Sequence, residues 1–214
     1  MSNKDGQRKR EVAVRREYGR LAAVYDKRWT HYVRASAEQT LDRINLTESE
    51  LLLDVGCGSG EVLQSLRRMY PSAGAVGIDI SLDMLRVTKE KSVPNVPLTS
   101  GSAAALPFPS ETFDIVTSTS AFHYWRDPML SLDELLRVLK PGGRMVITDW
   151  CHDYLACRIC DQYLRLFNAS HFRTYGKEEL GGLLTAAHFE DVLVERYKIS
   201  WLWGMMTAQA RRPA

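Results

Sequence analysis

A short apolar segment that runs into a glycine-rich turn constrains this chain more than any other feature. Residues 51–60 read LLLDVGCGSG, and an amphipathic stretch over residues 61–70 follows directly. The pattern predicts a buried strand, a tight turn and a helix, so that backbone N–H groups at the start of the helix face a ligand. The glycines are spaced GxGxG, whereas the dinucleotide fingerprint GxGxxG has its third glycine one position later. The segment therefore predicts a nucleotide-type pocket.

A second unit of the same kind comes next. Residues 75–78 form a short apolar run that ends at Asp79, and residues 82–91 have the periodicity of a helix. An acid at the carboxyl end of the strand after a glycine turn can accept hydrogen bonds from both hydroxyls of a ribose. We therefore expect Asp79 and its neighbour Ile80 to contact an adenosine ligand. Nicotinamide-dependent enzymes share this feature.

Two later segments distinguish between adenosine-binding families. Residues 101–109 read GSAAALPFP and lead through the apolar run at 113–117 towards His123, and residues 132–143 read LDELLRVLKPGG. Together with the glycine turn and Asp79, these segments resemble, in the correct order, the motifs of class I S-adenosylmethionine-dependent methyltransferases. In particular they resemble the small-molecule enzymes related to the ubiquinone and menaquinone C-methyltransferases. The resemblance extends from about residue 18 to residue 148, and it implies that residues 132–143 form a helix and a Pro-Gly-Gly turn before a strand at 144–148.

The resemblance implies S-adenosylmethionine as the cofactor and S-adenosylhomocysteine as the product. It also implies that the cofactor contacts the N-terminal segment, where the family has a Tyr-Asp pair like Tyr25-Asp26; a packed amphipathic aromatic is an equal alternative for Tyr25. The implied cofactor-binding residues are Tyr25, Asp54, Gly56, Cys57, Gly58, Gly60, Asp79, Ile80, Ser102, Ala103 and Ser120.

The adenine loop departs from the family pattern at one position. The family usually has an acid there, whose carboxylate accepts a hydrogen bond from the adenine amino group, and this chain has Ser102. A hydroxyl can also accept, but without charge assistance it contributes roughly 1 kcal/mol less. We therefore expect a modest cofactor affinity.

Strand and helix patterns alternate after residue 46, which requires a mostly parallel sheet with right-handed crossovers. The predicted fold is α/β, a Rossmann-like three-layer sandwich with a seven-stranded sheet whose final strand, in the resembling family, is antiparallel. Helices over residues 11–27 and 35–44 would cap the ligand edge. A length of 214 residues with 45% hydrophobic content suits one domain. Its expected parts are the cap 1–45, the cofactor-binding core 46–150 and the remaining helices and strands 151–214.

Charge and hydropathy restrict the partners. The net charge is +2, and the nine basic and four acidic residues among residues 1–30 are better explained by a solvated helix than by a nucleic-acid site. No apolar run reaches the length of a membrane span, so we expect a cytoplasmic protein without stable membrane insertion. The expected partner is a small-molecule methyl acceptor, not nucleic acid, and the expected assembly is a monomer or homodimer.

Methyl transfer from a sulfonium needs an acceptor held in line with the breaking bond, and it needs no metal. A base is required only when the acceptor must lose a proton. His123, just after the strand at 113–117, is the best candidate for that base, and an equal alternative is a wall position among neighbouring aromatics. The sequence therefore predicts no metal ligands.

The nature of the acceptor is less constrained. Residues 118–121 read STSA and lack the Asn or Asp, prolines and aromatic of amino methyltransferases, which favours a small molecule with an oxygen or carbon acceptor. The apolar run at 201–206 would suit a quinone-like or lipid-like compound. One alternative is a thiol or metalloid methyltransferase that uses Cys151, Cys157 and Cys160, although buried reduced thiols are favoured for them. Others are a nicotinamide-dependent oxidoreductase and a catalytically silent cofactor-binding protein.

Overall fold

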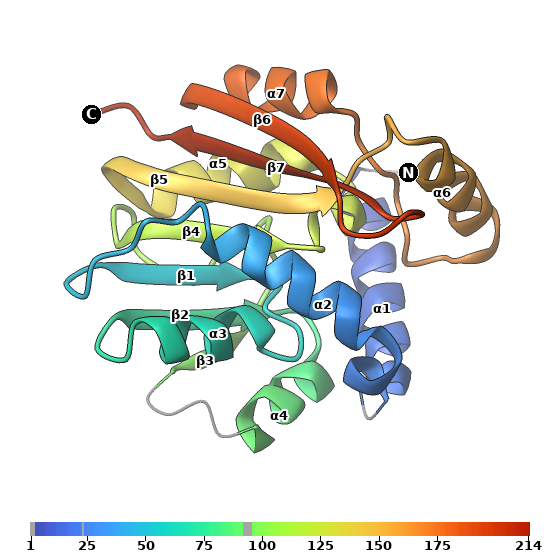
Figure 1. Ribbon diagram of the computed structural model, residues 1–214, viewed down its shortest axis with the longest axis horizontal. Coiled ribbons are helices and arrows are strands. Elements are labelled where there is room, and N and C mark those ends of the chain that lie inside the picture. Colours follow the sequence, from blue (N-terminus) through green and yellow to red (C-terminus); the bar gives the residue numbers. More distant parts are fainter. Residues whose placement is uncertain (1–2, 23, 92–95) are drawn as a thin grey trace.

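The computed structural model describes residues 3–22, 24–91 and 96–214, with the backbone alone at residues 3–10 and 26. The strands in this part are β1 Leu51–Val55, β2 Gly74–Asp79, β3 Leu98–Ser100, β4 Phe113–Thr119, β5 Leu139–Trp150, β6 Glu190–Lys198 and β7 Gly204–Arg211. They form a seven-stranded sheet in the order β3-β2-β1-β4-β5-β7-β6, in which only β7 runs against its neighbours (Figure 1). The predicted Rossmann-like α/β sandwich with a mostly parallel sheet is confirmed.

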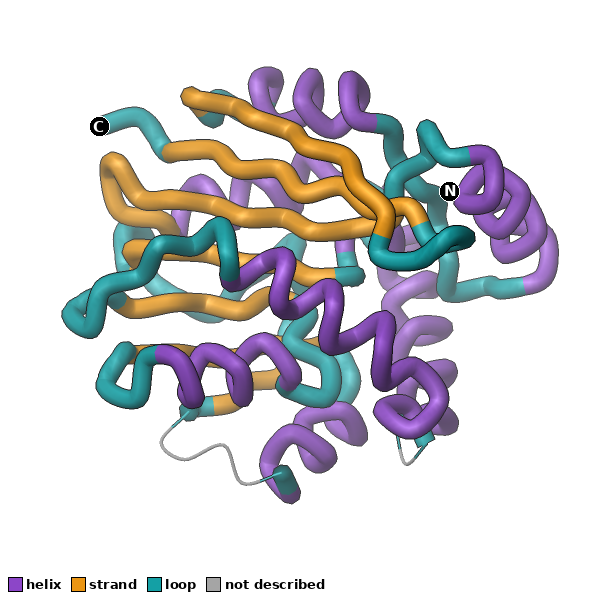
Figure 2. Tube along the Cα trace, in the orientation of Figure 1, coloured by secondary structure: helices purple, strands orange, loops and turns teal. Residues whose placement is uncertain are grey.

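The helices of the described residues are α1 Asn3–Leu21, α2 Tyr25–Leu41, α3 Glu61–Met69, α4 Leu82–Glu90, the short 3-10 helix η1 Phe122–Tyr124, α5 Pro128–Val138, α6 Leu155–Phe167 and α7 Lys177–Ala186. α2 and α3 cover one face of the sheet, and α5 and α7 cover the other (Figure 2). α1 stands beside the carboxyl ends of the central strands, and α6 lies near the turn between β6 and β7. None of these helices has the continuous apolar length needed to cross a bilayer.

Alternate residues of the central strands enter two separate cores, because successive side chains of a strand point to opposite faces. Leu52 and Ile115 pack in a core with residues of α2 and α3, whereas their neighbours Leu53 and Val116 pack in a core with residues of α5 and α7. All four side chains are completely buried. Burial of each side chain contributes roughly 2 kcal/mol to the free energy of unfolding. Because both faces of these strands are buried, their sequences are unbroken apolar runs and not alternating ones.

The strand order reverses between β1 and β4. The chain leaves β1 towards β2 and β3 on one side, and it leaves β4 towards β5 on the other. The turns that follow β1, β2 and β4 therefore open at the same edge of the sheet, at the switch point where open α/β sheets bind their ligands.

The N-terminal helices differ from those expected at residues 11–27 and 35–44. α1 ends at Leu21 and α2 begins at Tyr25, with a non-helical residue, Trp29, inside α2. The two helices pack on different parts of the molecule: Gly19 of α1 lies against Asp83 of α4, whereas α2 packs on α3 and the sheet. Tertiary packing therefore sets the boundary, and helical periodicity in the sequence did not reveal it.

The Pro-Gly-Gly segment also differs from expectation. A turn was expected there before a strand over residues 144–148, but β5 already begins at Leu139. Leu139 pairs with Phe113 and Arg144 pairs with Ile115, so the intervening residues of β5 form a bulge. A proline without an N–H and Gly142 with a φ of 71° suit such an irregularity.

Candidate active site

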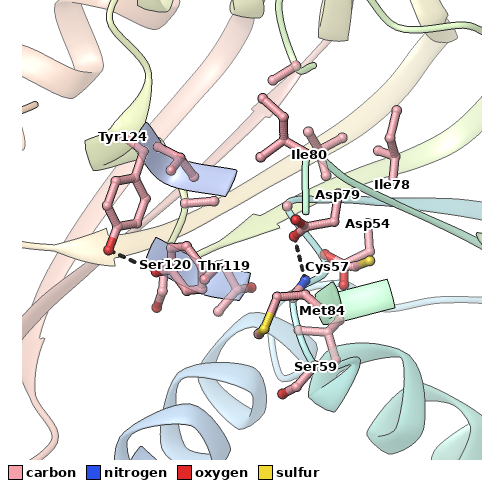
Figure 3. Close-up of a pocket in the computed structure, with 18 of the residues that line it drawn as sticks. Asp54, Cys57, Ser59, Ile78, Asp79, Ile80, Met84, Thr119, Ser120 and Tyr124 are labelled. Carbon is pink, nitrogen blue, oxygen red and sulfur yellow. Dashed lines mark hydrogen bonds between the residues drawn. The ribbon is translucent and has the colours of Figure 1, made fainter. Parts of the chain in front are cut away.

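A pocket opens at the carboxyl ends of β1, β2 and β4, between these strand ends and one side of α1 and α2 (Figure 3). Most of the residues predicted to contact the cofactor line it together: Tyr25, Asp54, Gly56, Cys57, Gly58, Asp79, Ile80, Ser102, Ala103 and Ser120. Gly60 and His123 are not among the lining residues. The side chain of Asp26 lies outside the described part of the chain.

The glycine turn after β1 has a backbone conformation that favours glycine at three positions. Gly56, Gly58 and Gly60 have φ values of 76°, 52° and 81°, which L-residues with a Cβ rarely adopt. A Cβ at Gly60 would lie 2.4 Å from Cγ2 of Thr88 on α4. Gly60 therefore permits close packing of the turn against α4, whereas Gly56 and Gly58 face the pocket.

Asp79, at the end of β2, fixes the shape of this turn. Its Oδ2 accepts a hydrogen bond of 2.8 Å from the N–H of Gly58 (Figure 3). Its Oδ1 accepts one of 2.8 Å from the N–H of Ser81. Burial raises the pKa of Asp79 in spite of these two donors. Since each carboxylate oxygen can accept more than one hydrogen bond, Asp79 keeps the capacity to bind a ligand hydroxyl.

Asp54, inside β1, has an incomplete set of partners. Its Oδ1 accepts a hydrogen bond of 3.1 Å from the Thr117 hydroxyl, and its buried Oδ2 has no partner among the described residues. Burial raises the pKa of this carboxyl to about 7. An unpartnered buried carboxylate oxygen is costly. The lining of the pocket therefore has an acceptor that suits a cationic or hydrogen-bond-donating group of a ligand.

Aromatic side chains form the opposite wall, and of these the sequence predicted only Tyr25. The Tyr18 hydroxyl donates to the Tyr124 hydroxyl at 2.8 Å, and Tyr32 donates to the Ser120 hydroxyl while accepting a 2.6 Å hydrogen bond from Nε1 of Trp150. Burial raises the pKa of Tyr18, Tyr32 and Tyr124, so the phenols remain protonated. Tyr18 lies on the same face as Tyr25 in the helix expected at residues 11–27, which was a signal for it, but the sequence had none for Tyr32.

His123 lies behind this wall, where it is 3% exposed. Its Nδ1 is 2.7 Å from Oδ1 of Asp149, and its backbone N–H donates to Oδ2 of the same carboxylate at 2.9 Å. The imidazole stacks on Trp150, with ring centroids 5.1 Å apart. The sequence did not predict Asp149, 26 residues away, as the partner of His123.

The cysteines make contacts within the protein. The Cys157 thiol donates to the carbonyl of Gly204 at 3.3 Å, and Cys151 lies 3.6 Å from Asp153. Burial raises the pKa of Cys151 to about 11 and also raises that of Cys157, so both stay protonated and are poor nucleophiles. In the described ranges, no group of three or more His, Cys, Asp or Glu is arranged to hold a metal ion.

Comparison with known proteins agrees with this arrangement. A family model described as "Methyltransferase domain" matches residues 53–147. A demethylmenaquinone methyltransferase of Geobacillus sp. (strain WCH70) is 30% identical in an alignment that covers 83% of this chain and 92% of that protein. A nocamycin O-methyltransferase of Saccharothrix syringae is 34% identical over 136 residues, which cover 61% of this chain and 49% of that protein.

The fold is similar to solved methyltransferase structures. A chain from the complex between the Trm112 methyltransferase activator and a methyltransferase of Haloferax volcanii superposes with a TM-score of 0.82 at 21% identity, covering 92% of this chain and 98% of that one. The family match and the relatives show an enzyme that uses S-adenosylmethionine, not the nicotinamide-dependent alternative, and the fold is consistent with this. The chain belongs to the class I S-adenosylmethionine-dependent methyltransferases, and it is similar to the menaquinone-type small-molecule enzymes among them.

Proposed function

We propose that this enzyme transfers the methyl group of S-adenosylmethionine to an oxygen or carbon atom of a small, planar, quinone-like acceptor. One observation carries the proposal: two acids and the glycine turn on one wall of the pocket face tyrosines of α1, α2 and η1 on the other. The first wall has the groups that a nucleoside and an amino acid require. The second has the flat apolar surfaces that an aromatic ring requires.

The cofactor wall suits the parts of S-adenosylmethionine. We assign the ribose hydroxyls to Asp79, which retains acceptor capacity beside the glycine turn. The ammonium of the methionine portion matches the unpartnered Oδ2 of Asp54. The adenine belongs beside Ile80 and Ala103, both of which line the pocket.

When bound, S-adenosylmethionine supplies an electrophilic methyl group on a positively charged sulfur. The chain itself has to orient the acceptor and exclude water. Tyr18, Tyr32 and Tyr124 are buried phenols tied to one another or to Trp150 and Ser120, so their positions are fixed before the acceptor arrives. Rigid aromatic faces of this kind hold a planar ring in one orientation.

An acceptor hydroxyl or an activated carbon must lose a proton. We propose that His123, held at Nδ1 by Asp149, takes up that proton; because His123 does not line the pocket, the proton has to reach it through the aromatic wall. His123 lies next to Tyr124 and Trp150, which places the base directly behind the aromatic wall. One relative is named a demethylmenaquinone methyltransferase, which supports a quinone-like ring. Another is named a nocamycin O-methyltransferase, which supports an oxygen acceptor.

Incubation of the protein with methyl-labelled S-adenosylmethionine and a panel of acceptors, followed by mass spectrometry, tests the proposal. The panel holds short-chain quinols, phenols, lipids, thiols and arsenite. We expect label on quinols or phenols. Label on thiols or arsenite alone would favour the alternative based on Cys151, Cys157 and Cys160. Cofactor binding without labelling of any acceptor would favour a catalytically silent binding protein.

We also propose a domain organisation, a cellular location and an assembly for this protein. Residues 1–214 act as one domain with a cap at 1–45, a cofactor-binding core at 46–150 and an accessory part at 151–214. The protein works in the cytoplasm as a monomer or homodimer. Size-exclusion chromatography with light scattering would distinguish these two assemblies.

A further inference from the structure

The adenine loop, which lacks the acid usual in this family, has a carboxylate beside it from another part of the chain. The Ser102 hydroxyl donates a 2.7 Å hydrogen bond to Oε1 of Glu11, a residue of α1 that is 91 positions earlier. The same hydroxyl oxygen accepts a 3.2 Å hydrogen bond from the N–H of Ala104. The one proton of Ser102 is therefore directed at Glu11, and both residues line the cofactor pocket.

Glu11 reaches the pocket as part of a helical face. Glu11, Val14 and Tyr18 lie at positions i, i+3 and i+7 of α1, which puts them on one side of the helix, and all three line the pocket. That side includes Tyr18, whose hydroxyl is bound to Tyr124 at 2.8 Å. The helix thus presents an acid, an aliphatic side chain and a phenol to the same cavity.

Two further contacts hold α1 in this position. Glu17 accepts hydrogen bonds from Asn168 and from the Ser170 hydroxyl on the segment after α6. Gly19 packs so closely on α4 that a Cβ there would lie 2.7 Å from Oδ2 of Asp83. The place of the Glu11 carboxylate is therefore set by a docked helix, not by the local conformation of the adenine loop.

We propose that Glu11 supplies the carboxylate that accepts the exocyclic amino group of adenine, and that Ser102 positions this carboxylate. The inference rests on the proposed placement of the nucleoside between Asp79 and the loop at 101–104. A carboxylate accepts several hydrogen bonds, so the bond from Ser102 leaves Glu11 able to accept another. A hydrogen bond from an amine to a carboxylate is about twice as strong as one to a hydroxyl. Adenine recognition then depends on α1 being docked, which couples cofactor binding to closure of the cap.

Binding of a nucleoside in which oxygen replaces the amino group can distinguish recognition of adenine by Glu11 from a purely structural role of Glu11. S-inosylhomocysteine presents a carbonyl where S-adenosylhomocysteine presents an amine, and a carbonyl repels a carboxylate. In calorimetric titrations, we expect the wild type to prefer S-adenosylhomocysteine by about 10-fold or more. In Glu11→Gln, whose amide can accept from the amine or donate to the carbonyl, the preference falls to within about threefold.

Two variants provide controls on the same measurement. Glu38→Gln removes an exposed acid of α2 that does not line the pocket, so both affinities and the preference should stay unchanged. Ser102→Asp in the Glu11→Gln background returns an acid to the loop and restores the preference. An unchanged preference in Glu11→Gln would overturn the inference.

The titration also distinguishes this inference from the placement on which it rests. Asp79→Asn should weaken both ligands equally, since the ribose is common to them. If Asp79→Asn leaves both affinities unchanged, the proposed placement of the nucleoside is wrong. If Asp79→Asn weakens both ligands while Glu11→Gln keeps the full preference, the placement holds and the role of Glu11 is wrong.

Discussion

The two walls of the pocket are built in different ways. The cofactor wall consists of turns that directly follow β1, β2 and β4, so the register of the sheet fixes its backbone. The acceptor wall consists of side chains from α1, α2 and η1. They are held by single long-range contacts, such as the hydrogen bond between Trp150 and Tyr32, which are 118 residues apart. A wall fixed by the sheet suits the cofactor that the whole family shares. A wall fixed by a few contacts is the part of the pocket in which acceptor preference can differ between members of the family.

This difference separates two kinds of substitution. Changes at the turns after the strands should affect folding and cofactor affinity, whereas changes behind the aromatic wall should affect turnover with the cofactor still bound. Glu11 is the exception, because we place it on the cap side with a role in cofactor recognition.

The largest effect is expected where the glycine turn meets α4. Gly60→Ala forces a residue with a Cβ into a φ of 81° and puts that Cβ 2.4 Å from Thr88. The backbone conformation and the overpacking together should lower the free energy of unfolding by about 2 to 5 kcal/mol, measured in urea. Gly182→Ala, with no atom within 4 Å of its Cβ, is the matched control and should not destabilise. Equal stability of the two variants would show that the turn can relax.

Asp79→Ala tests the cofactor wall. Loss of both ribose hydrogen bonds should cost roughly 2 to 4 kcal/mol, which is about 30-fold to 1,000-fold in the dissociation constant. The loss should be similar for S-adenosylmethionine and S-adenosylhomocysteine in calorimetric titrations. Because Asp79 also binds the N–H groups of Gly58 and Ser81, the thermal midpoint without ligand should fall as well. Binding within threefold of the wild type would remove Asp79 from the proposed ribose site.

His123→Ala tests the acceptor wall. We expect turnover to fall about 100-fold because the proposed base is lost, while the affinity for S-adenosylhomocysteine changes little. Asp149→Asn should produce a smaller loss, because the amide holds the imidazole and the backbone of His123 less firmly than the carboxylate does. His31→Ala, an exposed histidine of α2, is the control. Unchanged turnover in His123→Ala would make this residue a structural part of the wall.

The smallest expected effect is the release of a proton when the cofactor binds. Burial raises the pKa of Asp54 to about 7 from its ordinary value of 3.8. The protonated carboxyl therefore stabilises the free protein below about pH 4, and this stabilisation is lost as the pH rises to about 7. A cofactor ammonium beside Oδ2 favours the charged form, so binding near pH 6.5 should release a proton and strengthen as the pH rises through 7.

Calorimetry in buffers of different ionisation enthalpy measures this release. Asp54→Asn should abolish most of it. Asp79 also has a raised pKa, so a release that persists in Asp54→Asn would belong to Asp79 and would contradict the assignment of the ammonium to Asp54.

The same difference between the walls explains what the sequence could predict. The strand, glycine turn and Asp79 follow from patterns within about ten residues, and the structure gathers nearly all of the predicted cofactor residues in one pocket. The break between α1 and α2 and the partners of Ser102 and His123 depend on contacts over 26 to 106 residues, which leave no local periodicity. Ser102 carried one indirect signal, because the adenine loop lacks its usual acid there, but from this the sequence predicted only a modest cofactor affinity.

A structure of the complex with S-adenosylhomocysteine tests the central claim most directly. We predict that the nucleoside lies at the carboxyl ends of β1, β2 and β4, with both ribose hydroxyls within hydrogen-bonding distance of Asp79 and the ammonium beside Asp54. The sulfur should then face the aromatic wall of Tyr18, Tyr32 and Tyr124. A nucleoside bound with its ribose away from Asp79, or with its sulfur directed away from these tyrosines, would contradict the account.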